Sequence, residues 1–179
     1  MKVQIIYTSL TGCTEKVARA IYDGLEGEKS IHNLSDGVPA LDGDIVLVGY
    51  WGTSGVPCEE MDAFLHTIRG KVVGVFATLG YYADSSHAFD TVRYGVDLLA
   101  KENEIIGSYV CNGAISTALK AGQGLDGPHT PTEQKEIRWE VTDSHPTQAE
   151  CALAAERFRE RIYLYQRCRE MGIPFASIL

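Results

Sequence analysis

The segment from Val3 to Glu15 constrains the fold most strongly, because an apolar run passes through a polar turn into a helical pattern. Val3–Tyr7 has the length and apolar character of a buried strand, and a helical pattern begins near Thr14. The turn between them is rich in hydroxyl side chains and contains Gly12, which permits a tight backbone turn. Where a strand turns into a helix in this way, free amide N–H groups point outward and the helix dipole favours an anion. The stretch therefore predicts a phosphate site.

Strand and helix patterns then alternate along the chain. Strand patterns occupy residues 29–34, 45–50, 71–79 and 104–111, and the first of these is weak and typical of an edge strand. Helices are expected between them, and the one after residue 85 should place on its inner face Phe89, Val92, Val96 and Leu99. Such alternation implies right-handed crossovers and a parallel sheet with helices on both faces. The sequence predicts an α/β fold: a three-layer doubly wound sandwich around a five-stranded parallel sheet in the order 2-1-3-4-5.

Residues 114–144 do not follow this alternation, because they are rich in Gly, Pro, Thr and charge. We expect a short helix and a partly ordered loop there. Pro146 suits the first turn of a long final helix, whose core face should contain Ala155, Phe158, Ile162 and Tyr165. The chain is therefore expected to form a single domain over residues 1–179, with an irregular excursion at about 114–144 before the C-terminal helix.

Composition excludes several classes of partner and site. The net charge of −8 argues against a nucleic-acid or anionic-membrane surface, and no apolar run is long enough to span a bilayer. The chain enters a strand pattern at once, without a signal segment, which predicts a cytoplasmic location. The five cysteines are scattered without a C-x-x-C pair, so neither a disulfide framework nor a zinc site is expected.

Ligands of doubly wound sheets bind where the carboxyl ends of the strands meet, which here directs attention to residues 8–14, 51–57 and 78–84. The first loop lacks the Walker lysine and the G-x-G-x-x-G pattern, so neither a nucleoside triphosphate nor a dinucleotide is expected. A polar turn of this kind is often only a turn, and Tyr50-Trp51 alone would be read as sheet-edge packing. However, Tyr81 and Tyr82 end the neighbouring strand, and aromatic rings from two adjacent loops form a slot for a flat ring.

Three motifs resemble the flavodoxin family, whose members bind FMN without a covalent bond and shuttle electrons. Ser9-Leu10-Thr11-Gly12-Cys13-Thr14 matches the family's phosphate loop, Trp51-Gly52 matches the aromatic-glycine pair of its second flavin loop, and Thr78–Ser86 resembles its third loop. The resemblance covers residues 1 to about 113 and resumes with the last helix, and it implies a flavodoxin-like fold. Cys13 stands where the family often has Asn, and Thr53 where an acidic residue is common.

The resemblance implies a role for each matching residue. The phosphate would be held by the hydroxyls of Ser9, Thr11 and Thr14 and by the amides of Leu10, Gly12 and Cys13. Trp51 would cover one face of the flavin, and either Tyr81 or Tyr82 would cover the other. The peptide of Gly52, followed by Thr53, would flip to accept a hydrogen bond from N5 of the reduced flavin. The backbone of Thr78, Leu79, Gly80 and Tyr81 would contact the pyrimidine edge.

The leading functional prediction is an FMN-binding electron carrier between a donor reductase and an acceptor oxidoreductase, present as a monomer or weak dimer. Its acidic character should lower the potential of the reduced flavin. The alternative is an NAD(P)H-dependent FMN or quinone reductase on the same fold, with a nicotinamide site under residues 114–144 near His129. A module that has lost its cofactor and binds only partners is a third interpretation, against which the intact first loop argues. A response-regulator receiver would need clustered acidic residues after the first strand, and Ile6-Tyr7-Thr8 has none.

Overall fold

A parallel sheet forms the centre of the protein. The computed structural model describes residues 1–124, 127–128 and 132–176. Its five main strands run in the order β2-β1-β3-β5-β6, which is the expected 2-1-3-4-5 order of an α/β flavodoxin-like sandwich. A short sixth strand, β4 (Val56–Pro57), pairs antiparallel with β3 and was not expected. The bounds of the main strands are β1 Val3–Tyr7, β2 Lys29–Asn33, β3 Ile45–Thr53, β5 Val72–Leu79 and β6 Glu104–Asn112.

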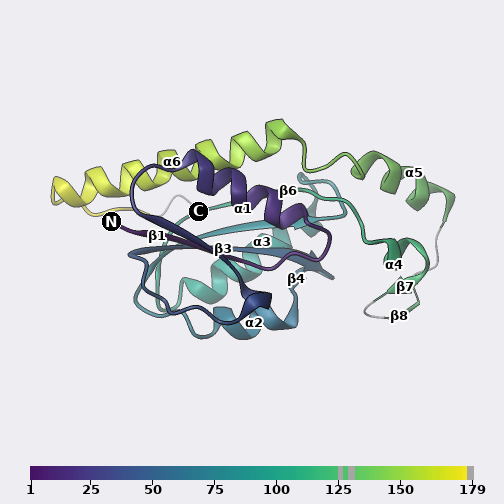
Figure 1. Cartoon of the computed structure of the whole chain (residues 1–179), viewed down its shortest axis with the longest axis horizontal. Helices are drawn as coiled ribbons and strands as arrows, with labels where there is room; N and C mark the ends of the chain where they lie inside the picture. Colours follow the sequence, from purple (N-terminus) through teal and green to yellow (C-terminus); the bar gives the residue numbers. More distant parts are fainter. Residues whose placement is uncertain (125–126, 129–131, 177–179) are drawn as a thin grey trace.

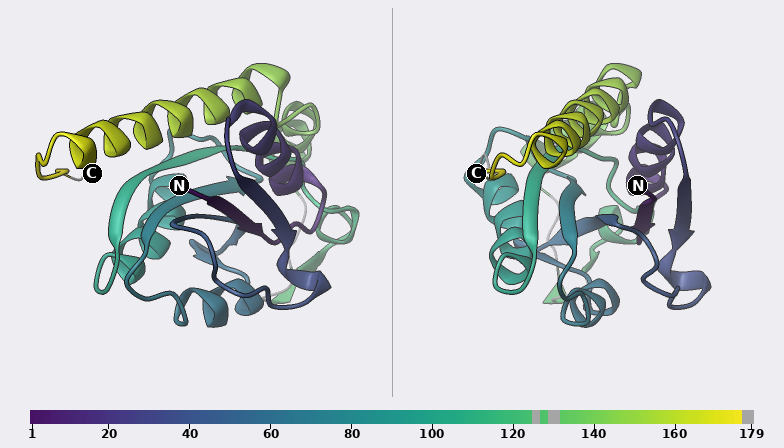
Figure 2. Two further views of the ribbon diagram at one scale, coloured as in Figure 1. Left: turned by 60° about the vertical axis from the view of Figure 1, so that its left-hand side comes forward. Right: turned by 90° about the vertical axis from the view of Figure 1, so that its left-hand side faces the viewer.

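Helices cover both faces of the sheet (Figures 1 and 2). On one face α1 (Cys13–Gly24) lies beside the long α6 (Gln148–Glu170), and on the other lie α2 (Glu59–Leu65) and α3 (Ser86–Leu99). A single turn of 3-10 helix, Leu34–Asp36, follows β2. Each face has its own apolar core, one centred on Phe76 and Phe158 and the other on Tyr50 and Met61. The end-on view in Figure 2 shows the resulting three layers.

Strand β3 is longer than expected and changes character along its length. Its residues from Ile45 to Tyr50 are buried, as a strand covered on both faces requires. Tyr50 is fully buried under α3 and donates its hydroxyl to the carbonyl oxygen of Thr91 at 2.9 Å. Burial raises the pKa of Tyr50 well above its usual value, so the hydroxyl stays neutral and donating. Trp51, the next residue, points to the opposite side and is half-buried.

Helix α3 begins after residue 85, as expected, but the prediction for Phe89 is wrong. The Ser85 hydroxyl accepts the Ala88 amide at 3.1 Å, which fixes the helix start. The buried stripe then runs from Ala88 through Val92 and Val96 to Leu99. Phe89 lies one position beyond that stripe, which turns its side chain about 100° toward solvent, and it is 57% exposed.

Helix α6 begins at Gln148, two residues later than Pro146 suggested. Thr147 is the N-cap, and its side chain and that of Glu150 form a reciprocal capping box. The core face contains Phe158, Ile162 and Tyr165 as expected, but Ala154 is buried there and Ala155 is only partly buried. Ala154 lies four residues before Phe158 and Ala155 three, so both are near the same face, and Ala154 is the one nearer its centre.

The excursion has more regular structure than expected. It contains α4 (Thr117–Lys120), the short strands β7 (Gln123–Gly124) and β8 (Gly127–Pro128), and α5 (Glu133–Thr142). Figure 1 shows these elements beyond the carboxyl ends of the central strands. The Lys120 ammonium bonds both carboxylate oxygens of Asp143, at 2.5 and 2.6 Å, and so ties α4 to the end of α5. Within the described ranges, no helix is long and apolar enough to cross a membrane, and no cluster of His, Cys, Asp or Glu could hold a metal ion.

Candidate functional site

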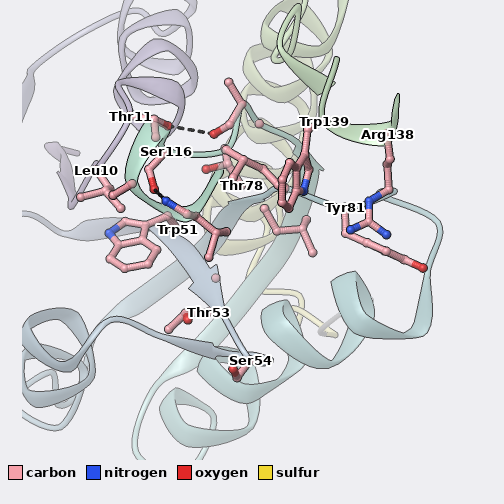
Figure 3. Close-up of a pocket in the computed structure, with 18 of the residues that line it drawn as sticks. Leu10, Thr11, Trp51, Thr53, Ser54, Thr78, Tyr81, Ser116, Arg138 and Trp139 are labelled. Atoms are coloured by element: carbon pink, nitrogen blue, oxygen red, sulfur yellow. Dashed lines mark hydrogen bonds between the residues drawn. The ribbon is translucent and has the colours of Figure 1, made fainter. Parts of the chain in front are cut away.

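A cavity of about 440 Å³ lies where the carboxyl ends of β1, β3 and β5 meet the excursion (Figure 3). This volume is within the range of small-molecule and cofactor sites. The three loops singled out in the sequence supply one side of it, and the excursion supplies the other. The lining residues are Leu10, Thr11, Trp51, Gly52, Thr53, Ser54, Thr78, Leu79, Gly80, Tyr81, His87, Gly113, Ala114, Ile115, Ser116, Ala118, Leu119, Gln123, Lys135, Arg138 and Trp139.

The loop after β1 presents a run of free backbone amides. Gly12 has a φ of 83°, a left-handed conformation that favours glycine, and it is the N-cap of α1 without a side-chain cap. The amides from Leu10 to Thr14 donate no hydrogen bond to any residue that the structure describes. Successive free amides at a helix N-terminus form an anion-binding concavity. The geometry of the loop therefore suits a phosphate group.

The hydroxyls of this loop mostly bond the protein itself. Ser9 accepts the amide of Glu15 at 3.2 Å, and the Thr14 and Thr78 hydroxyls lie 2.9 Å apart in a buried contact. Thr11 donates to the carbonyl oxygen of Ala114 at 3.2 Å and still lines the cavity. Among the three hydroxyls predicted to hold the phosphate, only that of Thr11 borders the cavity. The backbone, more than the side chains, is available to a ligand here.

Cys13 fastens the excursion to the phosphate loop. It is 4% exposed, and its Sγ lies 3.2 Å from the amide nitrogen of Ala114, where the excursion begins. The same sulfur lies 3.6 Å from the carbonyl oxygen of His145, where the excursion ends. Ala114 and His145 are themselves joined by a backbone hydrogen bond of 3.2 Å. The cysteine that departs from the family pattern is thus a packed contact between the loop and both ends of the excursion.

The aromatic residues divide between the cavity and the surface. Trp51 and Tyr81 both line the cavity, while Tyr82 is 45% exposed and lies outside it. The Tyr81 ring makes edge contacts with Tyr82 at 5.5 Å and with His87 at 6.1 Å between centroids. Figure 3 shows Trp51 beside Leu10 and Tyr81 on the other side of the cavity. Of the two tyrosines, Tyr81 is the one placed to face a ligand.

Gly52 lies within strand β3, paired with Pro57, and not in a turn. A Cβ at this position would lie 2.4 Å from Cγ2 of Thr91, so glycine is required for the close approach of α3. The turn itself is made by Ser54 and Gly55, with φ of 49° and 85°, as in a two-residue hairpin. The glycine of the aromatic-glycine pair therefore has a packing role in addition to any role toward a cofactor.

Sequence reasoning missed the cavity wall supplied by α5. Lys135, Arg138 and Trp139 line the cavity, and the Arg138 guanidinium lies 4.5 Å from the centroid of the Tyr81 ring. Trp139 is 4% exposed and is one of the two buried residues of α5. From the excursion's other side, Ile115 packs so closely on Gly80 that a Cβ there would lie 2.3 Å from Ile115 Cγ1. The available signal was a lone tryptophan next to a basic residue in a polar segment.

A doubly wound sheet with free amides after β1 and an aromatic cavity beside them defines the class of flavodoxin-like proteins. The chain belongs to the flavodoxin domain family, whose sequence profile matches residues 4–159. It is also similar to the flavodoxin-like domain-containing protein BilS of Clostridioides difficile strain CD3. The two are 32% identical over 158 residues, which cover 84% of this chain and 90% of BilS.

Solved structures agree with this fold. The flavodoxin of Fusobacterium nucleatum, determined bound to flavin mononucleotide, matches with a TM-score of 0.55 and 20% identity over 93% of this chain and 97% of its own. Flavodoxin 2 of Bacillus cereus matches with a TM-score of 0.57 and 18% identity, covering 90% of this chain and 99% of its own. At these identities the likeness concerns the fold.

Proposed function

We propose that the chain is a single flavodoxin-like domain that binds FMN and carries one or two electrons from a donor reductase to an acceptor oxidoreductase. The observation that supports this most directly is the run of unbonded amides from Leu10 to Thr14 beside an aromatic-walled cavity. A cytoplasmic location and a monomeric or weakly dimeric state are part of the same proposal. Family membership and the FMN-bound flavodoxin among the similar structures support the choice of cofactor.

The residues present fit FMN as a whole. The free amides would hold the phosphate, and the Thr11 hydroxyl would remain beside it. Trp51 and Tyr81 would enclose the flavin ring, with Ile115 on Gly80 excluding water from the excursion side. The strand ends at Thr78 and Leu79 would supply backbone groups to the ring edge. The bound flavin supplies the electron-transfer chemistry, and the protein binds it, orients it and sets its potentials.

Reconstitution with FMN tests this proposal. Purified protein mixed with FMN should quench flavin fluorescence with one site per chain and give the absorption spectrum of a flavoprotein. Riboflavin, which lacks the phosphate, is the matched control ligand. It should bind about a hundredfold more weakly, because each charge-assisted hydrogen bond to the phosphate contributes about 1.5–3 kcal/mol. Protein that stays colourless after reconstitution would overturn the proposal.

The kinetics of NADPH oxidation distinguish the electron carrier from the alternative, an NAD(P)H-dependent reductase. An isolated electron carrier should oxidise NADPH only in the presence of a donor reductase, whereas a reductase would turn over NADPH with free FMN or a quinone. His129, the residue that the sequence suggested for a nicotinamide site, lies outside the described residues. Steady-state NADPH oxidation by the FMN-loaded protein therefore decides between the two functions.

A further inference from the structure

Two adjacent side chains of α5 present buried donors without acceptors to the cavity. The indole Nε1 of Trp139 and the guanidinium Nε of Arg138 are both buried and have no hydrogen-bond partner. No hydrogen bond or ion pair joins Arg138 to any residue that the structure describes. Leaving a buried donor unpaired costs about 1–3 kcal/mol, so such groups in a folded protein call for an explanation. Both residues line the cavity, which indicates that a ligand supplies the acceptors.

These donors are held in place before any ligand arrives. Trp139 is 4% exposed, and Arg138 stacks over the Tyr81 ring at 4.5 Å. Helix α5 is fixed at its start by the Thr132 hydroxyl, which accepts the Lys135 amide at 3.3 Å. Its end is fixed by the bond from Lys120 to Asp143. The first bond is internal to the helix, whereas the second joins its end to α4, so α5 is tied to the rest of the excursion at Asp143.

The cavity is basic although the protein is acidic. The chain carries a net charge of −8, yet the described lining residues include no carboxylate and two cations, Lys135 and Arg138. The acidic residues of α5, such as Glu136 and Glu140, are exposed and do not line the cavity. The described part of the lining is therefore basic although the chain as a whole is acidic.

The positions of Arg138 and Trp139 in the cavity decide which part of a bound FMN these two side chains would contact. Thr11 and Arg138 lie on opposite sides of the cavity, and the Trp139 ring stands between Thr78 and Tyr81 (Figure 3). The phosphate already has the free amides at the Thr11 side. A cofactor anchored there extends its ring across the cavity, toward Trp139 and Arg138.

We propose that the Trp139 indole N–H and the Arg138 guanidinium bind the carbonyl-bearing edge of the flavin ring and bind it more tightly once it is reduced. This inference rests on the proposed function. Two electrons and one proton from the donor convert the neutral oxidised ring into a ring with one negative charge. A cation and an N–H donor in a water-poor cavity favour that charged state over the neutral one. Arg138 and Trp139 are thus residues that set the flavin potential.

The test compares oxidised and reduced FMN on three variants. Arg138→Gln removes the charge, Trp139→Phe removes the N–H together with part of the ring, and Arg138→Lys keeps the charge but removes the Nε donor. The matched control is Arg93→Gln, because Arg93 also lies over an aromatic ring, at 5.8 Å from Phe89, but on the exposed side of α3. Affinity for oxidised FMN is measured by fluorescence quenching, and the midpoint potential by titration with dithionite and a reference dye.

Arg138→Gln should lower the affinity for reduced relative to oxidised flavin about tenfold, a shift of about 30 mV for a two-electron couple. Trp139→Phe should lower the same ratio about threefold, since one neutral hydrogen bond contributes about 0.5–1.5 kcal/mol. Arg138→Lys keeps the charge but loses the planar guanidinium and its Nε donor, so it should lower the ratio less than Arg138→Gln does. Arg93→Gln should keep the ratio within about twofold of the unmodified protein.

The outcomes separate this inference from the proposed function. If the unmodified protein binds no FMN, the proposed function fails and the inference fails with it. If every variant binds FMN with the same ratio of reduced to oxidised affinity, FMN binding stands and the inference is overturned. If Arg138→Gln does not fold, Trp139→Phe and Arg138→Lys decide. An unchanged ratio in Trp139→Phe, or an unchanged ratio in Arg138→Lys, contradicts the assignment.

Discussion

The loop at residues 8–14 and helix α5 (Glu133–Thr142) border the same cavity, but they offer a ligand opposite kinds of contact. The loop offers backbone amides, while its own hydroxyls largely bond the protein. Helix α5 offers side chains, a guanidinium and an indole N–H, and little backbone. A backbone site tolerates changes of side chain, whereas a side-chain site is tuned by single substitutions. Under the proposed function, the loop side would bind the cofactor and the α5 side would set its potential, so the two properties could be changed separately.

The largest effect is expected from a charge placed on the loop side. Thr11→Asp should weaken FMN binding more than a hundredfold, because two like charges about 4 Å apart repel by about 4 kcal/mol at an effective dielectric constant of 20. The change is measured by FMN fluorescence quenching at fixed salt. Thr11→Val is the control, since it removes only the hydroxyl that bonds Ala114. Similar losses in both variants would show that the side chain, and not the backbone, holds the phosphate.

Removing the anchor of the α5 side should destabilise the excursion and spare the sheet. Trp139→Ala empties a site that is 96% buried, and such truncations cost about 3–5 kcal/mol. Hydrogen exchange should speed up across α5 and α4 while β1 and β5 stay protected. Tyr163→Ala, on a residue that is 64% exposed, serves as the control. Equal loss of protection in the sheet would mean that the two regions unfold as one unit.

A smaller effect is expected from a substitution that tests how Gly52 of β3 packs against α3. Gly52→Ala places a Cβ 2.4 Å from Thr91 Cγ2, and overpacking of this kind costs about 1–3 kcal/mol. Urea unfolding of FMN-free protein measures the loss without any contribution from a cofactor. The double variant Gly52→Ala/Thr91→Ser removes the clashing methyl and should recover most of the stability. Full stability of the single variant would leave a cofactor role as the sole reason for glycine here.

The smallest expected effect is a pH-dependent loss of stability at Glu150, in the first turn of α6 where the excursion ends. Burial alone would raise the pKa of Glu150, but hydrogen bonds from the Thr147 amide and hydroxyl and from His145 Nδ1 outweigh it and hold that pKa below its usual 4.5. A carboxylate with a lowered pKa stabilises the fold above its unfolded pKa, and this stabilisation is lost as the pH falls. Glu150→Gln should therefore cost about 1 kcal/mol at neutral pH.

That difference should shrink as the pH falls from about 5 through the lowered pKa, because both proteins then carry a neutral side chain. Thermal unfolding from neutral to acidic pH measures it. Glu156→Gln, on the exposed side of α6, is the control and should show no such trend. A constant difference across the range would contradict the hydrogen-bond account.

The part of the site formed by the loops after β1, β3 and β5 was predictable, because neighbouring residues in the sequence determine its structure. Apolar runs give the strands, Ser85 gives a cap, and the loop after β1 carries a family motif. Phe89 was placed on the inner face because it lies three residues before Val92, but Ala88, four residues before Val92, takes the buried position. Gly52 was only half explained, since its contact with Thr91 depends on how closely α3 packs.

The part of the site formed by the excursion was less predictable, because contacts between residues far apart in the sequence determine its position. Nothing near Arg138 in the sequence shows that its guanidinium lies over Tyr81, more than fifty positions earlier. The helix itself has a weak apolar pattern, with Trp139 and Thr142 as its buried residues. A helix held by one large ring and a few polar contacts leaves little periodic signal. Its position is therefore readable only from the folded chain.

The sulfur of Cys13 has a thermodynamic consequence. It contacts Ala114 and His145, the two ends of the excursion, while its own amide belongs to the free run after β1. An anion bound to those amides stabilises the first turn of α1 by an amount that grows with the logarithm of its concentration. Both ends of the excursion contact Cys13 in that same turn. Part of this stabilisation is therefore expected to reach α4 and α5, which lie between those ends. We expect anion binding and the order of the excursion to be linked equilibria, in which the bound anion favours the ordered excursion and the ordered excursion favours anion binding.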